Sequence, residues 1–135
     1  MAILISKKTR VLIQGITGAS GAQAASDLLD YETKLVAGVT PGKGGQEVDT
    51  VPVFNSVSEA IESVGPVDAS MIYVPPFLVK GAAMEAIEAR IPLIHIFAEK
   101  VPVLDVSQIL RAAKKANVRV LGPASVGVIS PGEAK

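Results

Sequence analysis

The sequence predicts a single α/β domain, in which a doubly wound, mostly parallel sheet carries helices on both faces. Apolar strand-like runs alternate with helical segments through short connections, which is typical of right-handed β-α-β units. The strand-like runs are continuously apolar and do not alternate with polar residues, as expected for a sheet covered on both faces. The 135 residues suit one domain, which we expect to span 1–135.

The first half of the chain contains two buried strands and one short edge piece. A β-branched, apolar run ends in a glycine cluster at 15–21, and good helix formers follow it. A long Gly/Pro loop separates the second strand from the edge piece. The expected elements are strand 9–14, helix 22–29, strand 34–39, loop 40–46 and strand 51–54.

The second half repeats the alternation. Ser56 and Glu59 have the spacing of a capping box, which predicts a helix start, and Gly65-Pro66 ends that helix. Two later helices have amphipathic patterns. Val79, Ala83, Ala86 and Ile87 are expected inward on one, and Val106, Ile109, Leu110 and Ala113 on the other. The expected elements are strand 69–74, helix 77–90, strand 93–97, helix 103–116 and strand 118–121. Residues 130–135 resemble the start of a linker.

Composition argues against several functions. Lys and Arg total 13 and Asp and Glu total 13, so the basic excess of a nucleic-acid partner is missing, and aromatic residues are only 4%. With no Cys and one His, the sequence predicts no metal site. No apolar run approaches the roughly 18 residues of a membrane span, and the N-terminus lacks the pattern of a secretory signal. We therefore expect a cytoplasmic protein that binds neither membrane nor nucleic acid.

The glycine cluster after the first strand is the strongest candidate site. Glycines allow close approach of the backbone to a ligand, and the start of the next helix directs unpaired amides at an anion. The alternative interpretation is a tight strand-to-helix turn without a ligand. The candidate phosphate-binding residues are Gly15, Thr17, Gly18, Ala19, Ser20 and Gly21.

The loop after the second strand bears on which nucleotide could bind. NAD-binding folds usually place an acid there, whereas this chain has Lys43 in a glycine-rich loop and no acid before Glu47. A lysine at that point favours a phosphate on the ribose, as in NADP or in coenzyme A (CoA). The alternative is a surface loop with a solvated lysine.

The ends of the third and fourth main strands supply further candidates. Tyr73, Val74 and Pro75 form an extended exit that could be an apolar wall beside an adenine or merely a rigid connection. At the fourth strand the candidates are Phe97, Ala98 and Glu99, and the Glu99-Lys100 pair could equally form a surface salt bridge. His95 is expected to be a core residue, and no catalytic residue is predicted.

Several motifs carry a resemblance to a known family. They are V-L-I-Q-G-I-T-G at 11–18, V-A-G-V-T-P-G-K-G-G at 36–45, P-V-F-N at 52–55, I-Y-V-P at 72–75, E-K-V-P-V-L-D at 99–105, G-P at 122–123 and P-G-E at 131–133. Across essentially the whole chain, this order resembles the N-terminal domain of the succinyl-CoA synthetase α subunit. The V-T-P-G-K-G-G segment is its most specific part.

The resemblance implies a CoA-binding domain on a Rossmann-like fold. It implies that Thr17 to Ser20 line the phosphate-binding loop, that Lys43 contacts the CoA phosphates, and that residues 97–99 lie against the cofactor. In the family, the complete enzyme is a ligase of the tricarboxylic acid cycle. It couples nucleotide triphosphate cleavage to thioester formation from succinate and CoA. A phosphorylated His in a second α-subunit domain carries the reaction, and a β subunit supplies the nucleotide site.

Three departures from the family pattern predict binding without catalysis by this chain alone. The second, phosphohistidine domain is absent from the 135 residues, and His95 is not its counterpart. The family's Pro-Asn-Cys-Pro-Gly loop is replaced by Pro123-Ala124-Ser125-Val126-Gly127. Lys100 replaces a family glycine beside Glu99, and Ser20 stands where a longer polar residue is common.

Two other functions remain open on the residues alone. One is an NADP-dependent reductase domain, which would share the glycine loop and the basic residue after the second strand. The other is a non-catalytic module that senses a CoA ester or nucleotide. Expected partners of the leading interpretation are CoA, a β-type subunit and the missing C-terminal domain.

Overall fold

The computed structural model describes residues 8–122. Its strands are β1 (Arg10–Gln14), β2 (Lys34–Val39), β3 (Glu47–Val48), β4 (Val51–Phe54), β5 (Ala69–Ile72), β6 (Leu93–Ile96) and β7 (Arg119–Leu121). Its helices are α1 (Ala19–Asp30), α2 (Val57–Val64), the short 3₁₀ helix η1 (Pro76–Leu78), α3 (Val79–Glu88) and α4 (Val103–Ala116). Among these residues, no helix is both long and apolar enough to cross a membrane.

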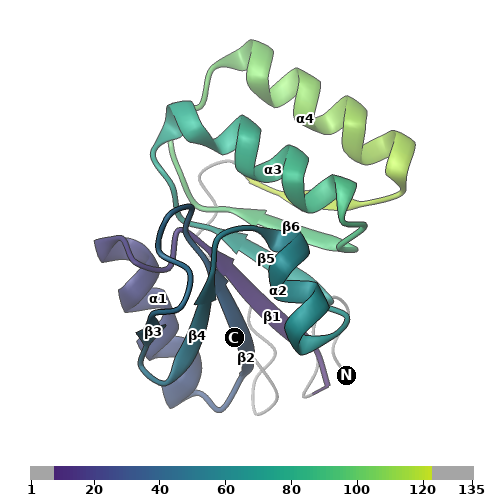
Figure 1. Ribbon diagram of the computed structural model, residues 1–135. Helices are drawn as coiled ribbons and strands as arrows, with labels where there is room; N and C mark the ends of the chain where they lie inside the picture. The colour runs from purple at the N-terminus through teal and green to yellow at the C-terminus, as the bar shows by residue number, and fades with distance from the viewer. Residues whose placement is uncertain (1–7, 123–135) are drawn as a thin grey trace.

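The strands form one seven-stranded sheet in the order β3-β4-β2-β1-β5-β6-β7. The β3–β4 pair is antiparallel and the other pairs are parallel, which confirms the predicted doubly wound topology. From β1 the chain winds outward to β2 and β4, then returns to β5 on the other side of β1 (Figure 1). Strand order therefore reverses between β1 and β5, where open α/β sheets place their ligands.

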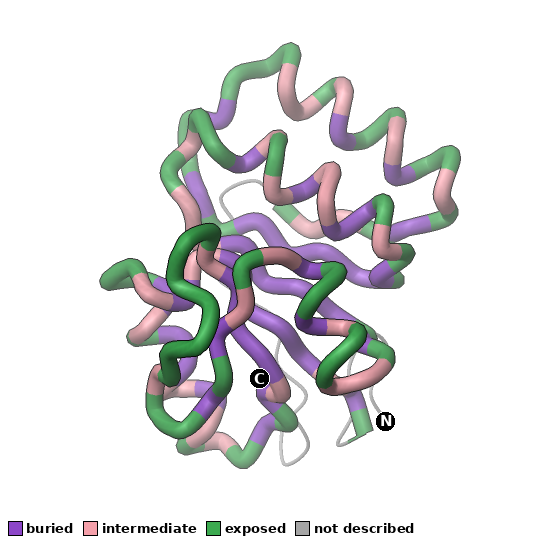
Figure 2. The backbone as a smooth tube through the Cα atoms, viewed as in Figure 1, coloured by how far each residue is buried: buried purple, intermediate pink, exposed green. Residues whose placement is uncertain are grey.

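Helices cover both faces of the sheet, and an apolar cluster lies between the sheet and the helices on each face. The buried residues are concentrated along the central strands (Figure 2). On one face, Ala25 and Leu28 of α1 pack with Val11 and Ile13 of β1. On the other face, side chains of α2, α3 and α4 pack against Leu12 of β1 and residues of β2, β5 and β6. The central strands β5 and β6 are buried at every position, as continuous apolar runs predict.

Most predicted elements are confirmed, with shifts at their ends. Helix 103–116 and strand 34–39 match their predicted bounds. Helix α1 begins at Ala19, three residues earlier than predicted, so it includes the last three residues of the glycine cluster. The strand β3 was not predicted, and it rather than β4 forms the sheet edge. The inward placement of Leu110 is wrong, because its side chain is 48% exposed. The segment 123–127 and the linker-like residues 130–135 lie outside the described residues.

The predicted capping box at α2 is correct for the serine and shifted for the glutamate. Ser56 Oγ accepts a hydrogen bond from the backbone N–H of Glu59 at 3.1 Å, as expected. The Glu59 carboxylate accepts from the N–H of Asn55 at 3.2 Å, one residue earlier than the usual reciprocal partner. The effect is that residues 55–59 form one rigid entry to α2, directly after β4.

Candidate functional site

Four strand ends meet at the carboxyl edge of the sheet, around the point where strand order reverses. The N–H of Gly15, directly after β1, donates to Val39 O at the end of β2 at 2.7 Å. The N–H of Tyr73, directly after β5, donates to Gln14 O at 2.8 Å. The N–H of Phe97, after β6, donates to Ile72 O at 3.2 Å. This edge therefore brings together the segments in which the sequence placed its candidate residues.

The three glycines of the first loop have different roles. Gly15 has φ +89°, and a Cβ there would collide with the Tyr73 carbonyl. A Cβ on Gly21 would collide with the Gly15 carbonyl. Gly15 is therefore required where the loop passes the chain leaving β5, and Gly21 where α1 packs on the loop after β1. A Cβ on Gly18, in contrast, would make only an ordinary 3.5 Å contact with Gly15 O. Close contacts explain Gly15 and Gly21, whereas Gly18 could accommodate a Cβ.

The start of α1 is suited to holding an anion. Gly18 is the N-cap residue and makes no side-chain cap hydrogen bond, and the first turn contains no acidic residue. Gly18, Ala19 and Ser20 are exposed. The first amides of a helix have no intrahelical acceptor and lie at the positive end of its dipole. An external phosphate is the natural partner for these amides.

Thr40 connects the glycine loop to the end of β2. Its Oγ1 lies 3.1 Å from Thr17 Oγ1 and 3.4 Å from Thr17 N. The N–H of Thr40 donates to Phe54 O at 3.0 Å, which fixes Thr40 to the end of β4 as well. The two candidate phosphate-binding loops are therefore tied together before any ligand arrives.

The loop carrying Lys43 is exposed but ordered by hydrogen bonds. Asn55 Oδ1 accepts from Gly42 N at 3.0 Å and from Gly44 N at 2.9 Å. The N–H of Lys43 donates to Thr40 O at 3.0 Å. Lys43 thus stands between two glycines that share one acceptor, in the loop that follows β2 at the carboxyl edge of the sheet.

An aromatic pair closes the other side of the site. The rings of Tyr73 and Phe97 lie 5.0 Å apart at an interplanar angle of 31°, within the range of favourable aromatic contact. Burial raises the pKa of the Tyr73 phenol, with a smaller contribution from the charge of Asp27 in α1. Tyr73 therefore stays neutral at physiological pH, and the pair presents an uncharged surface next to the glycine loop.

The remaining candidates divide into exposed and buried residues. Pro75, Phe97 and Glu99 are exposed, and Val74 is half-buried beside Gly15. Ala98 belongs to the core cluster at 8% exposure, so its side chain packs in the core. His95 is 2% exposed within β6, with its ring 6.2 Å from that of Tyr73, in keeping with the predicted core role.

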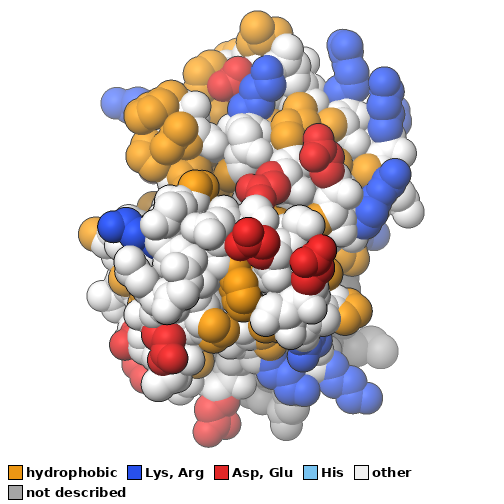
Figure 3. Space-filling view, in the orientation of Figure 1, with side chains coloured by type: hydrophobic (Ala, Val, Ile, Leu, Met, Phe, Trp, Pro, Cys, Tyr) orange, Lys and Arg blue, Asp and Glu red, His pale blue; other side chains and the backbone are white. Residues whose placement is uncertain are grey.

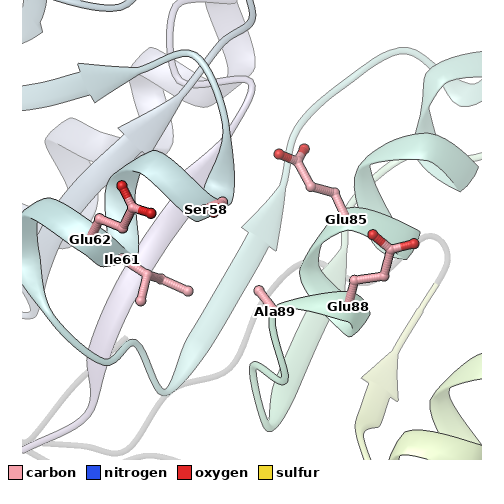
Figure 4. Close-up of a pocket in the computed structure, with 6 residues that line it drawn as sticks. All are labelled: Ser58, Ile61, Glu62, Glu85, Glu88 and Ala89. Carbon is pink, nitrogen blue, oxygen red and sulfur yellow. The ribbon is translucent and has the colours of Figure 1, made fainter.

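One cleft lies away from these residues, between α2 and α3 (Figure 4). Its volume is about 390 Å³, and it is lined by Ser58, Ile61, Glu62, Glu85, Glu88 and Ala89. Glu85 Oε2 accepts from the N–H of Val57 at 2.8 Å and so caps the start of α2 from a neighbouring helix. The carboxylates make this cleft a poor place for a phosphate-bearing ligand.

Two residues that organise the site were not among the sequence candidates. Thr40 and Asn55 act through hydrogen bonds to loops more than ten residues away in sequence, which local patterns do not reveal. The available signal was their position, since each directly follows a parallel strand at the carboxyl edge.

The fold and this edge define a nucleotide-binding α/β domain of the Rossmann-like class. Residues 6–100 match the family model described as the CoA binding domain. The chain belongs to this family of CoA-binding domains, which confirms the predicted cofactor class.

Relatives with similar sequences are α subunits of succinate–CoA ligases. The chain is 45% identical over 137 residues to the ADP-forming α subunit of Aquifex aeolicus, covering 100% of this chain and 45% of that one. It is 45% identical over 135 residues to α subunit 1 of Archaeoglobus fulgidus, covering 100% of this chain and 46% of the relative. The chain thus spans less than half the length of these relatives.

Solved structures with the same fold include enzymes of more than one kind. An ATP citrate lyase from Methanothrix soehngenii, in complex with citrate and coenzyme A, has a TM-score of 0.87 and 20% identity. The match covers 98% of this chain and 23% of that one. A dihydrodipicolinate reductase from Paenisporosarcina sp. TG-14 has a TM-score of 0.67 and 19% identity, covering 85% of this chain and 47% of that one. At these identities the likeness concerns the fold alone.

Proposed function

We propose that this domain holds CoA across the carboxyl ends of β1, β2, β5 and β6. In this arrangement the pyrophosphate lies on the first amides of α1, with the hydroxyls of Thr17 and Ser20 beside it. The observation that carries the proposal is the uncapped, acid-free start of α1 at the point where strand order reverses.

Lys43 is proposed to contact the 3′-phosphate of the CoA ribose. Its loop follows β2, where dinucleotide-binding folds recognise the ribose of their ligand. An ammonium group there favours a phosphorylated ribose, and an acid would favour free hydroxyls. Tyr73, Val74 and Pro75 are proposed as an apolar wall beside the adenine, with Phe97 next to Tyr73.

We further propose that the domain works within an α subunit of the succinate–CoA ligase type. The complete enzyme would form a thioester from succinate and CoA with cleavage of a nucleotide triphosphate, together with a second α domain and a β-type subunit. The identity of 43–45% across the whole chain supports this proposal. Because the proposed phosphohistidine belongs to the second domain, the 135 residues alone should bind CoA without forming thioester.

The surface near the site supports contact with further protein. Hydrophobic side chains gather at the ends of α3 and α4 that lie at the carboxyl edge, at the upper left of Figure 3. Phe77 is 75% exposed, Val103 85% and Leu104 67%. Exposed apolar groups gathered beside a ligand site are typical of an interface with a partner or a companion domain.

Titration calorimetry with CoA, dephospho-CoA and NADPH tests the function. We expect CoA to bind best, and dephospho-CoA to bind about tenfold more weakly because one charge-assisted contact is lost. Lys43→Met should abolish that difference. Lys34→Met is the matched control, because Lys34 is an exposed lysine at the opposite end of β2. Preferential binding of NADPH would instead favour the reductase function, and binding of none of the three would refute a nucleotide site.

A further inference from the structure

Asn55 sits where it can control the lysine loop. It is the first residue after β4, and its single carboxamide oxygen accepts from Gly42 N and Gly44 N at 3.0 and 2.9 Å. These two glycines flank Lys43. The asparagine therefore does for this loop what a cap does for a helix end, by pairing amides that would otherwise face solvent.

The rest of the loop closes on the same framework. The N–H of Lys43 donates to Thr40 O at 3.0 Å, and the N–H of Gly45 donates to Val53 O at 3.0 Å. These backbone bonds hold the two ends of the loop, at Thr40 and Gly45. Asn55 alone among the described side chains bridges both neighbours of Lys43.

Asn55 is itself held by a backbone hydrogen bond. Its N–H donates to the Glu59 carboxylate at 3.2 Å, within the hydrogen-bonded entry to α2. On the loop side, a Cβ on Gly44 would lie 2.6 Å from Asn55 Nδ2, so the glycine packs directly on the amide. The asparagine thus links the end of β4 to a loop whose residues 41–47 are exposed.

We propose that Asn55 is a positioning residue that sets the selectivity of the site for a 3′-phosphorylated ribose. It does so by holding the loop in the conformation in which Lys43 faces the ligand. This inference rests on the proposed role of Lys43 and deepens it. Asn55 need not touch CoA, since its effect passes through the backbone of residues 42–44.

The physical reason is the cost of ordering a flexible loop. Fixing the backbone of a loop residue costs conformational entropy, and immobilising a long lysine side chain costs more. A loop that is already ordered meets part of this cost during folding, so more of the ammonium–phosphate attraction contributes to binding. Without Asn55, part of that attraction would be offset by the conformational entropy lost when residues 41–46 become ordered on binding.

The test compares CoA with dephospho-CoA, because only CoA carries the phosphate that Lys43 would contact. Asn55→Ala should lower the affinity for CoA about tenfold and leave that for dephospho-CoA within about twofold. The ratio of the two affinities should therefore collapse. Gln46→Ala is the matched control, since Gln46 is exposed in the same loop and contributes its backbone N–H and C=O, which alanine keeps.

Gly44→Ala tests the contact between the loop and the Asn55 carboxamide by changing the loop residue. The backbone of Gly44 lies outside the left-handed region, unlike Gly42 at φ +84° and Gly45 at φ +92°, so alanine is allowed except for its clash with Asn55. The clash should displace the amide and reduce selectivity as Asn55→Ala does. In the Asn55→Ala background the atoms it meets are gone, and Gly44→Ala should cause no further loss.

The outcomes distinguish a failure of this inference from a failure of the proposed role of Lys43. Wild-type discrimination that survives in Asn55→Ala and in Gly44→Ala would overturn the inference and leave the role of Lys43 standing. An equal loss of affinity for both ligands would overturn it as well, because the role would then be general support. Wild type that binds both ligands equally would refute the role of Lys43 and this inference together. Far-ultraviolet circular dichroism of each variant confirms folding, and Gly44→Ala carries the test if Asn55→Ala does not fold.

Discussion

The side chains of Thr17 and Thr40 meet with their Oγ1 atoms 3.1 Å apart, which ties the glycine loop after β1 to the end of β2. The two residues are 23 positions apart in sequence. Each belongs to a loop that we propose contacts a phosphate of CoA. The contact makes the two loops one preformed surface. Its loss should weaken both CoA and dephospho-CoA, whereas removal of Lys43 should weaken CoA alone.

Replacing Thr40 with valine should weaken CoA and dephospho-CoA to the same extent. Valine keeps the shape of threonine but removes the hydroxyl that Thr17 contacts. A net hydrogen bond contributes about 1 kcal/mol, so we expect about a fivefold rise in both dissociation constants. Thr40→Ser keeps the hydroxyl and should bind nearly as wild type. Calorimetry with both ligands checks this, and a loss confined to CoA would show that Thr40 acts through the 3′-phosphate instead.

The glycines of the first loop should separate folding from binding. Gly21→Ala forces a Cβ against the Gly15 carbonyl and should lower the free energy of unfolding by about 1–3 kcal/mol. Gly18 has φ −74°, which alanine adopts freely, so Gly18→Ala should cost about 1 kcal/mol or less. Its main effect should be weaker CoA binding, because the methyl group lies beside the proposed position of the pyrophosphate. Urea unfolding and calorimetry on both variants measure the two effects, and the reverse pattern would contradict the division of roles.

Glu85 should contribute to stability without affecting the ligand. Its carboxylate accepts the Val57 N–H at the start of α2, so Glu85→Ala should lower the free energy of unfolding by about 1 kcal/mol. Glu88→Ala is the control, because Glu88 lines the same cleft (Figure 4) and is exposed. Equal stability of the two variants in thermal unfolding would show that the cap is unimportant. A change in CoA affinity for either variant would place the ligand nearer this cleft than we propose.

Tyr73 should make stability depend on alkaline pH. Burial first, and the charge of Asp27 second, raise the pKa of its phenol above the ordinary value of 10.0. The folded state therefore retains this proton to higher pH than the unfolded chain does. The associated stability is fully present below about pH 10 and is lost as pH rises through the folded-state pKa.

The measurement uses urea unfolding at pH 9 to 11 on wild type and Tyr73→Phe. Wild type should lose stability more steeply over this range, because phenylalanine has no proton to lose. The variant leaves Tyr31 as the single tyrosine, so a difference spectrum near 295 nm reports the Tyr73 titration directly. A midpoint at or below the ordinary tyrosine value would contradict the buried setting of the ring.

Much of the fold was predictable because its signals are local. The largely apolar runs at 34–39 and 93–97, and the amphipathic pattern of 103–116, indicate buried strands and a surface helix. The start of α1 was placed too late because Ala19, Ser20 and Gly21 lie within a glycine-rich run that is typical of a loop, although they form the first turn of the helix. Leu110 was misplaced because periodicity alone does not show how wide a face of α4 is covered.

Candidate residues could be chosen from the sequence where a motif suggests the chemistry, and not where the fold brings distant residues together. The glycine loop and Lys43 stand out in the sequence because they directly follow strands, where open α/β sheets bind ligands, and their contacts with CoA stay predictions. Thr40 and Asn55 lie within motifs shared with the family but were not chosen as site residues, since their hydrogen bonds form only when β1, β2 and β4 lie side by side. Position at the carboxyl edge was the available guide to both residues.

A backbone amide titration with CoA, followed by heteronuclear NMR, tests the central claim most directly. If the start of α1 holds the pyrophosphate, the amide resonances of Ala19, Ser20 and Gly21 should make the largest downfield shifts, and dephospho-CoA should reproduce them. The amide of Lys43 should shift with CoA and much less with dephospho-CoA. Shifts centred on Ser58, Ile61 and Glu88, with the glycine loop unchanged, would contradict the account.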